Sequence, residues 1–348
     1  MKKILFPILT VSLLIAFTAC KPQAKTFKMD VNLVVQNSTD TSTINNINAI
    51  LKKRLLTFGL KEKSISSEIK GNTIRLKLSG VTDTVRLKRQ LTTPGNLEFR
   101  ETYELGEVFS YLDNADKYLI SHPKIVIKKQ PKKQESGGSD LAELFEDESQ
   151  KTDSLLTGEE WDMSHPLFGR LRLNTGMDGT AQKGSLVGFS HIKDTAVVNT
   201  YLRMPDVRPL LPADLQFAWS KDPAKYSSDT LYELHAIKTA NVDGKAPVNG
   251  NVVVSALVLS GKKYAFPVVQ ISMNNEGAAA WGIMTRDNTG RSIAIMIDGR
   301  VVSSPRVMSE ITGGISEISA AFTISEAEEL ADVINSGCLP ASVVIEDN

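Results

Sequence analysis

The hydrophobic pattern between residues 30 and 105 alternates between strand and helix periods. Val31, Leu33 and Val35 alternate with polar residues, as in a strand with one buried face, and a helical pattern then runs to Gly59. The remaining patterns predict strands near 65–69, 74–78 and 97–99 and a short helix over 83–91. The order βαββαβ is that of a ferredoxin-like unit, an antiparallel sheet with two helices on one face.

A second α+β region is predicted over residues 185–348. Its first half predicts one helix over 194–202 and strands over 186–192, 215–219, 231–237 and 252–259. In its second half, a strand over 268–273 precedes a helix that carries Trp281, and alternating isoleucines lead to Asp298-Gly299, a strong signal for a two-residue hairpin. A final helix and a last strand over 342–345 complete the region. The chain is therefore predicted to be an α+β protein of two subdomains.

Three of the predicted helices have residues that can cap their first turn. Side-chain oxygens of Ser, Thr, Asn and Asp accept hydrogen bonds from the otherwise unpaired N–H groups there. The predicted caps are Thr41 or Ser42 for the first helix, Asn274 or Asn275 for the helix with Trp281, and Ser325 with Glu328 as a capping box for the last helix.

The segment 106–184 between the two regions is predicted to be a charged and partly disordered linker. A basic patch over 128–133 and acidic residues from Asp140 to Glu148 flank Gly137-Gly138 and offer little apolar surface to bury. Such a composition does not offset the loss of chain entropy on folding. A short helix near 141–145 is the one element expected there. A solvated linker is favoured over an electrostatic docking arm.

The first twenty residues are typical of a secretory leader. Two lysines precede an apolar run over 4–17, which is shorter than the roughly 20 residues that span a bilayer, and small residues then lead to Cys20. This ending resembles a lipobox, so Cys20 is the predicted site of lipid attachment and residues 21–29 would be a tether. An ordinary signal cleaved near Ala19, or a short uncleaved anchor, stays open. All three predict a location in the bacterial envelope, most simply the periplasm.

The charge balance argues against nucleic acid as a partner, and the cysteine content argues against an internal disulfide bond. The chain carries 40 basic and 40 acidic residues, and no one-signed stretch indicates a nucleic-acid surface. If Cys20 is acylated, Cys338 is the remaining cysteine, so no intramolecular disulfide is expected. Cys338 is most simply a small packed residue.

The sequence lacks the common catalytic and metal-binding signatures. The His-Glu-x-x-His pair, the Gly-x-Ser-x-Gly elbow, the Walker loop and the dinucleotide glycine motif are all absent. The histidines are scattered, at His122, His165, His191 and His235. We therefore expect a protein that is not an enzyme, with no metal, no cofactor and no small-molecule substrate.

One glycine pair allows two interpretations. Gly313-Gly314 follows Ile311-Thr312 between two predicted strands, where glycines permit a positive φ. A simple turn is favoured over a flexible lip beside a groove that binds an extended peptide. Arg286, at the end of the preceding helix, is most simply a solvated side chain.

The C-terminal region resembles the head subdomain of the SecD and SecDF protein-export family. The similarity rests on Ser272-Met273-Asn274, Thr285-Arg286-Asp287-Asn288, Asp298-Gly299, Ser304-Pro305, Glu310-Ile311-Thr312-Gly313-Gly314 and Leu339-Pro340-Ala341. The first region is similar to the base subdomain of that family through Arg54, Phe58-Gly59, Leu78-Ser79-Gly80-Val81 and Gly95-Asn96-Leu97-Glu98-Phe99-Arg100. Ser304 stands where alanine is more usual in the family.

This resemblance implies the first periplasmic domain of the family, as a stand-alone lipoprotein with a base over 30–105 and a head over 185–348. In the family this domain is thought to hold emerging unfolded preprotein while a proton-conducting membrane part drives the cycle. Unfolded secreted polypeptide and the Sec translocon are therefore the implied partners. The implied peptide-binding or hinge residues are Arg286, Asp298, Gly299, Ser304, Pro305, Ile311, Thr312, Gly313 and Gly314.

Two points separate this sequence from the family pattern. The leader stands in place of the family's first membrane helix, and Asn348 lies about where family members enter their next one, so we do not expect a proton-driven motor. The alternative function is a repurposed envelope module that recognises a folded partner complex, because one fold can serve unrelated functions. Binding of unfolded chains would distinguish the two.

Overall fold

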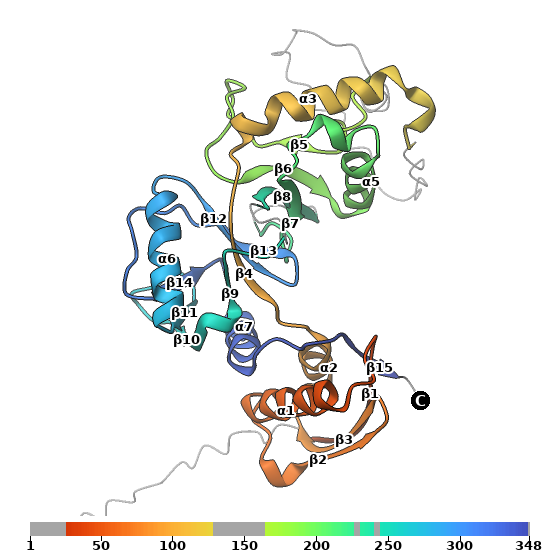
Figure 1. Ribbon diagram of the computed structural model, residues 1–348, viewed down its shortest axis with the longest axis vertical. Helices are drawn as coiled ribbons and strands as arrows, with labels where there is room; N and C mark the ends of the chain where they lie inside the picture. Colours follow the sequence, from red (N-terminus) through yellow and green to blue (C-terminus); the bar gives the residue numbers. More distant parts are fainter. Residues whose placement is uncertain (1–25, 128–163, 226–229, 240–243, 347–348) are drawn as a thin grey trace, which may run out of the picture.

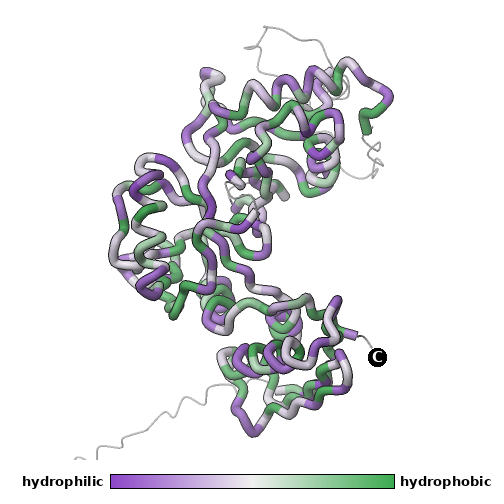
Figure 2. The backbone as a smooth tube through the Cα atoms, viewed as in Figure 1, coloured by the Kyte–Doolittle hydropathy of each residue, from purple (hydrophilic) through white to green (hydrophobic). Residues whose placement is uncertain are grey.

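The computed structural model describes residues 26–127, 164–225, 230–239 and 244–346. These residues form three lobes along an arc (Figure 1). We call them the base lobe (27–93 and 343–346), the middle lobe (94–102 and 244–342) and the upper lobe (103–239, where described), and each has its own hydrophobic cluster. Figure 2 shows hydrophobic and hydrophilic residues alternating along the backbone in all three lobes. In the described part, no helix is both long and apolar enough to cross a bilayer.

The base lobe has the predicted ferredoxin-like form, but its fourth strand comes from the C-terminus. Its elements are β1 (Phe27–Val35), α1 (Thr41–Thr57), β2 (Ile65–Lys70), β3 (Thr73–Val81), α2 (Thr84–Thr92) and β15 (Val343–Glu346). The sheet order is β15-β1-β3-β2, with all pairs antiparallel. Leu33 of β1 lies opposite Ile345 on one side and Ile74 on the other. The base sheet is therefore complete only when β15 pairs with β1.

The sequence therefore predicted the wrong sheet for the strand at 97–99. It forms β4 (Leu97–Glu101), which pairs with β12 and β9 in the middle lobe. The last strand, predicted to belong to the head, likewise pairs with β1 of the base. Alternating hydrophobicity identifies a strand with a buried face but does not encode which sheet it joins. The turn at Pro94-Gly95, where Gly95 has a φ of 82°, leads the chain out of the base.

The middle lobe encloses its core between two sheets and two helices. One sheet has the order β13-β12-β4-β9 and the other β10-β11-β14. The elements not yet given are β9 (Val248–Asn249), β10 (Val253–Leu259), β11 (Val268–Met273), α6 (Asn275–Asp287), β12 (Ile293–Ile297), β13 (Arg300–Ser303), β14 (Ile315–Ser319) and α7 (Ile324–Ser336). Phe99 and Trp281 pack at the centre with ring centroids 5.0 Å apart. The predicted hairpin at Asp298-Gly299 is confirmed, since both residues have positive φ.

The upper lobe packs two helices on a sheet of order β5-β6-β8-β7. Its elements are α3 (Leu105–Ser121), β5 (Arg172–Leu173), β6 (Leu186–His191), α5 (Ile192–Arg203), β7 (Leu215–Trp219) and β8 (Leu231–Lys238). A small cluster of Ala218, Ile237, Ala294, Met296 and Val301 joins it to the middle lobe. Short 3₁₀ turns complete the described elements: η1 (Glu62–Ser64), η2 (Pro123–Ile125), η4 (Arg208–Leu210) and η5 (Gly250–Val252).

The start of the predicted linker is ordered, contrary to expectation. Helix α3 begins at a capping box between Glu104 and Glu107 and buries one side completely, at Leu105, Val108, Leu112, Ala115 and Leu119. The charge of the later residues dominated the interpretation of 106–184, although the apolar residues of this helix recur at helical spacing. The short helix predicted near 141–145 lies outside the described residues.

Helix caps were predicted with mixed success. Asn274 caps α6 as expected, by accepting a hydrogen bond from Gly277 N at 2.8 Å. Helix α1 is capped by Asp40, one residue before the predicted choices. The capping box of α7 uses Thr323 and Glu326, two residues earlier than predicted, because the hydroxyl of Thr323 lies in reach of Glu326 N.

Candidate functional site

The chain crosses between the base and middle lobes twice, and Arg54 of α1 binds both crossings. Its side chain is completely buried. The guanidinium donates to Gln90 O at 2.8 Å and to Thr93 O, and it reaches Pro94 O at 3.0 Å, Ser336 Oγ at 3.1 Å and Gly337 O at 3.1 Å. The crossings also bind each other, since Leu339 N donates to Pro94 O at 2.8 Å. One arginine therefore fastens the whole junction, which we call the lower junction.

Burial is the main electrostatic cost at Arg54. It lowers the pKa of the guanidinium to about 10, while the nearby carboxylate of Asp298 acts in the opposite direction. At neutral pH the side chain therefore stays protonated and keeps its donors. A buried charged group with satisfied hydrogen bonds is costly to remove, because its acceptors lose their partners.

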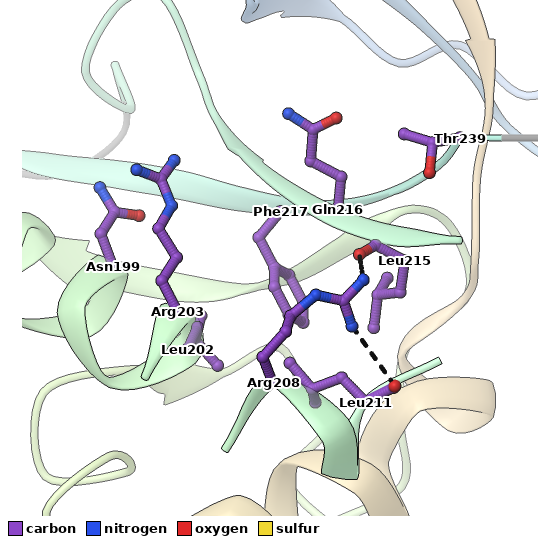
Figure 3. Close-up of a pocket in the computed structure, with 9 residues that line it drawn as sticks. All are labelled: Asn199, Leu202, Arg203, Arg208, Leu211, Leu215, Gln216, Phe217 and Thr239. Carbon is purple, nitrogen blue, oxygen red and sulfur yellow. Dashed lines mark hydrogen bonds between the residues drawn. The ribbon is translucent and has the colours of Figure 1, made fainter. Parts of the chain in front are cut away.

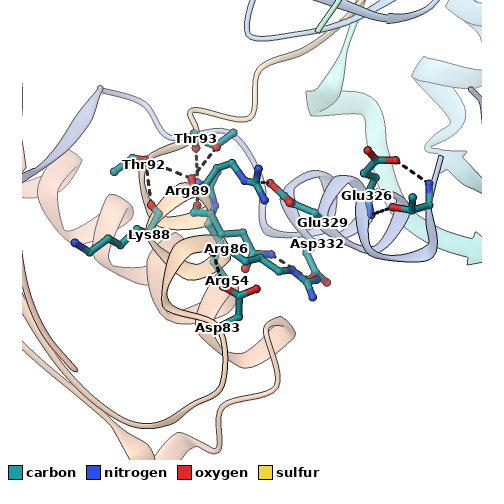
Figure 4. Close-up of polar contacts among 12 residues, drawn as sticks. Arg54, Asp83, Arg86, Lys88, Arg89, Thr92, Thr93, Glu326, Glu329 and Asp332 are labelled. Carbon is teal, nitrogen blue, oxygen red and sulfur yellow. Dashed lines mark hydrogen bonds and ion pairs between the residues drawn. The ribbon is translucent and has the colours of Figure 1, made fainter. Parts of the chain in front are cut away.

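Ion pairs between α2 and α7 lie around the buried Arg54. Figure 4 shows Arg86 and Arg89 facing Asp332 and Glu329. Arg89 Nε lies 2.9 Å from Glu329 Oε1, and Arg86 Nη2 lies 3.5 Å from Asp332 Oδ2. Burial raises the pKa of Asp332, although its partners oppose that effect. The contact between these helices is thus largely polar, as in interfaces between domains that move relative to each other.

Asp298, predicted as a site residue, adds a third contact to the lower junction. It lies in the turn between β12 and β13 with a φ of 52°. Its carboxylate accepts hydrogen bonds from Asn96 N at 2.8 Å and Gly95 N at 3.2 Å, and its own N–H donates to Asn96 O at 3.0 Å. Asp298 therefore holds the crossing segment against the middle lobe, and Gly299 completes its turn.

The predicted residues 311–314 form a turn fitted against α6. Ile311 N donates to the hydroxyl of Thr285 at 2.9 Å, and Gly314 O accepts from Met273 N at 2.8 Å. A Cβ on Gly314 would lie 2.7 Å from the Cβ of Ala278. Gly314 has a φ of 63°. The close approach and the positive φ together explain why glycine stands there.

Arg286 and Thr312 are exposed residues of the middle lobe. Arg286 pairs with its neighbour Asp287 at 3.0 Å, at the end of α6. Neither residue is tied to another lobe by a contact in the described part of the chain. Both positions can therefore carry a probe without disturbing the fold.

Ser304 lies at the junction of the middle and upper lobes, which we call the upper junction. Its Oγ is 2.5 Å from Ser185 Oγ, which in turn is 2.9 Å from His235 Nδ1. His235 Nε2 lies 3.4 Å from Glu233 Oε2. Pro305 follows and accepts a hydrogen bond from Ile293 N at 3.1 Å, within the middle lobe.

This arrangement has the residue types of a Ser-His-Glu triad. Ser185 and His235 are 2% and 4% exposed, and both line a pocket of about 390 Å³ together with Glu233 and Ser304. The contacts also connect β8 with the segment after β13. No sequence motif indicated them, because Ser185, His235 and Ser304 are far apart along the chain.

The nine predicted site residues thus occupy three places. Asp298 and Gly299 belong to the lower junction, and Ser304 and Pro305 to the upper junction. Arg286 and residues 311–314 lie on α6 or pack against it. Arg54 holds the most contacts of any residue at these places, yet the sequence offered only its similarity to the family. In the described residues, no group of three or more His, Cys, Asp or Glu side chains is placed to hold a metal ion.

Comparisons with known proteins agree with the resemblance seen in the sequence. Residues 228–341 match the model of the SecDF P1 head subdomain. The protein translocase subunit SecD of Rhodothermus marinus is 29% identical over 308 residues, which cover 87% of this chain and 46% of that protein. SecD of Sebaldella termitidis is 36% identical over 110 residues, 31% of this chain and 27% of that protein. The chain therefore spans less than half the length of these relatives.

One solved structure is matched as well. It belongs to a membrane component, SecDF, described as enhancing protein export. The match covers 92% of this chain and 99% of that chain, with 18% identity and a TM-score of 0.47.

Proposed function

We propose that this relative of the SecD and SecDF periplasmic domains is a non-catalytic envelope lipoprotein that binds unfolded or extended polypeptide and assists its export through the Sec translocon. The observation that carries the proposal is the similarity to SecD over 87% of the chain, together with the match of 228–341 to the head subdomain. The similarity includes both lobes of the lower junction, so it extends beyond a single shared motif.

The geometry supports a binding role in which lobes are presented to a partner. Two chain crossings, one buried arginine and a few ion pairs connect the base to the middle lobe. Each lobe keeps its own hydrophobic cluster, and Leu339 of the second crossing belongs to that of the base. The lobes can thus present separate surfaces to one extended polypeptide.

Photo-crosslinking in cells tests this function first. A photo-reactive amino acid at Thr312 or Arg286, both exposed on the middle lobe, is expected to capture secreted chains in transit or Sec subunits during active secretion. Matched control positions are Lys61 and Glu62, which are also exposed and belong to the base lobe. Mass spectrometry of the adducts identifies the partners.

The alternative function predicts a different set of adducts. A single folded partner at Thr312 and Arg286, with no secreted chains and no Sec subunits, would overturn the export proposal. That outcome would assign the chain to the repurposed interaction modules. Equal capture of secreted chains at Lys61 and Glu62 would argue that the middle lobe has no special role.

Lipid attachment is tested separately, because Cys20 lies outside the described residues. Cells fed an alkyne fatty acid are expected to label the wild-type chain and the Cys338→Ala variant, while Cys20→Ala loses the label. Acyl chains contribute about 0.8 kcal/mol per buried methylene, so the Cys20→Ala variant should also leave the membrane fraction. Persistent labelling of Cys20→Ala would refute acylation at this residue.

A further inference from the structure

The upper lobe has a groove between helix α5 and the edge strand β7, shown in Figure 3. Its volume is about 290 Å³. The side chains of Leu202, Leu211, Leu215 and Phe217 supply apolar walls, and Asn199, Arg203 and Gln216 stand at its rim. Among the described residues, no acidic side chain lines it. The groove is separate from both lobe junctions.

Strand β7 has a partly unpaired side next to this groove. Among the described residues it is the last strand in the order β5-β6-β8-β7. Its outer side is bound at both ends, where Leu215 O accepts from Arg208 at 3.3 Å and Lys221 N donates to Val301 O at 2.7 Å, which leaves Phe217 between them. Ser220 N donates to Glu233 O of the β8 segment at 2.8 Å, so the even-numbered residues of β7 direct their backbone groups toward β8. Because direction alternates along a strand, the N–H and C=O of Phe217 point away from the sheet.

The charge at the rim is positive and is not neutralised in the described part of the chain. Arg203 at the end of α5 is exposed and has no carboxylate within ion-pair distance among those residues. Arg208 directs its guanidinium at the carbonyls of Leu211, Pro212, Ala213 and Leu215, at 3.4, 2.9, 2.7 and 3.3 Å, and forms no ion pair among the described residues. A ligand with a carboxylate next to an apolar group would complement this surface.

We propose that this groove binds an extended polypeptide segment by strand addition to β7, with an apolar side chain in the groove and an acidic residue at Arg203. Main-chain hydrogen bonds to Phe217 hold the segment in any sequence, while the pocket selects alternate side chains. Such recognition suits a protein that meets many different unfolded chains. The inference rests on the proposed function and specifies where and how the polypeptide binds.

Fluorescence anisotropy with the full chain tests this inference. The probe is a labelled ten-residue peptide of alternating valine and threonine in which a central leucine is followed two residues later by aspartate, so that both side chains lie on one face (the Leu-Asp peptide). A second peptide has lysine in place of the aspartate (the Leu-Lys peptide). Methylating every second backbone nitrogen in the register that faces β7 is expected to weaken binding by about tenfold or more, because methylation removes the N–H groups that would donate to β7. Methylation in the other register should change little.

Two substitutions examine the walls of the groove. Arg203→Glu is expected to weaken the Leu-Asp peptide about three- to fivefold and to favour the Leu-Lys peptide instead, as for an exposed ion pair. Phe217→Ala removes an aromatic wall and is expected to cost about tenfold in affinity. Arg75→Glu, on the exposed surface of the base lobe, is the matched control and should leave both affinities unchanged.

The outcomes separate the inference from the proposed function. If the wild-type chain binds the peptide and neither methylation, Arg203→Glu nor Phe217→Ala changes the affinity, the groove is not the site and polypeptide binding stands. If the wild-type chain binds none of these peptides while the crosslinking experiment captures secreted chains, the strand-addition mode alone is overturned. If both experiments find no polypeptide, the inference and the proposed function fall together.

Discussion

Replacing Arg54 with methionine is expected to lower the free energy of unfolding by about 3–5 kcal/mol. The substitution keeps most of the side-chain volume but removes all donors from the lower junction. Four backbone carbonyls on the two crossings, Gln90, Thr93, Pro94 and Gly337, would then lose a buried partner. Urea unfolding followed by circular dichroism measures the loss.

Arg89→Met is the matched control for this experiment. Arg89 lies on the same junction, but its side chain is 61% exposed, and in the described part of the chain its ion pair is with Glu329, which is 13% exposed. Exposed pairs contribute about 0–1 kcal/mol, so the control should unfold close to the wild type. Arg54→Lys keeps the charge but not the planar guanidinium, so its unfolding free energy is expected to lie between those of Arg54→Met and Arg89→Met. Equal losses of unfolding free energy for Arg54→Met and Arg89→Met would show that the hydrogen bonds of Arg54 do not stabilise the junction.

The role of Arg54 shows what a sequence pattern can and cannot reveal. Position 54 falls within a run of helical periodicity, so the helix was predicted and the residue placed on it. Its partners are carbonyls of segments around 90–94 and 336–337, which carry no side-chain signature. Backbone acceptors are present at every residue, so no pattern marks those that an arginine will bind. The junction therefore became visible only in the folded chain.

The same limit explains the two strands that joined unexpected sheets. The alternation at 97–99 and at 342–345 correctly predicted β4 and β15. Their partners depend on where the chain turns at Gly95 and where it returns after α7. The base sheet is completed by the strand farthest away in sequence, since β15 supplies the position that a local reading gives to β4. Local signals specify elements, whereas tertiary contacts choose their neighbours.

Among the predicted site residues, the hairpin at Asp298-Gly299 was the best specified. The dipeptide fixes a two-residue turn because both positions need positive φ. Its further use, with the Asp298 carboxylate bound to Gly95 N and Asn96 N, required the fold. Ser304 was selected only through the family resemblance, and its contact with Ser185 and His235 follows from the packing of two lobes.

The glycine pair at 313 and 314 gives the second large effect. Gly314→Ala is expected to lower the free energy of unfolding by about 2–4 kcal/mol, from a strained positive φ and from overpacking. The new Cβ would lie 2.7 Å from Ala278 Cβ and 3.3 Å from Ala278 Cα, so the turn or the helix must move. Because α6 carries Trp281, whose indole donates to Ser316 Oγ at 2.7 Å, that movement would reach the core of the middle lobe.

Gly313→Ala is a control one residue away. A Cβ there meets no atom within 4 Å and its φ is not in the left-handed region, so unfolding should change by about 0.5 kcal/mol or less. Urea unfolding of both variants, followed by circular dichroism, decides between two interpretations of the pair. A large loss for Gly314→Ala alone shows a turn fitted to α6. Small and equal effects for both variants would instead mean that the segment yields easily, as a flexible lip beside a binding groove would.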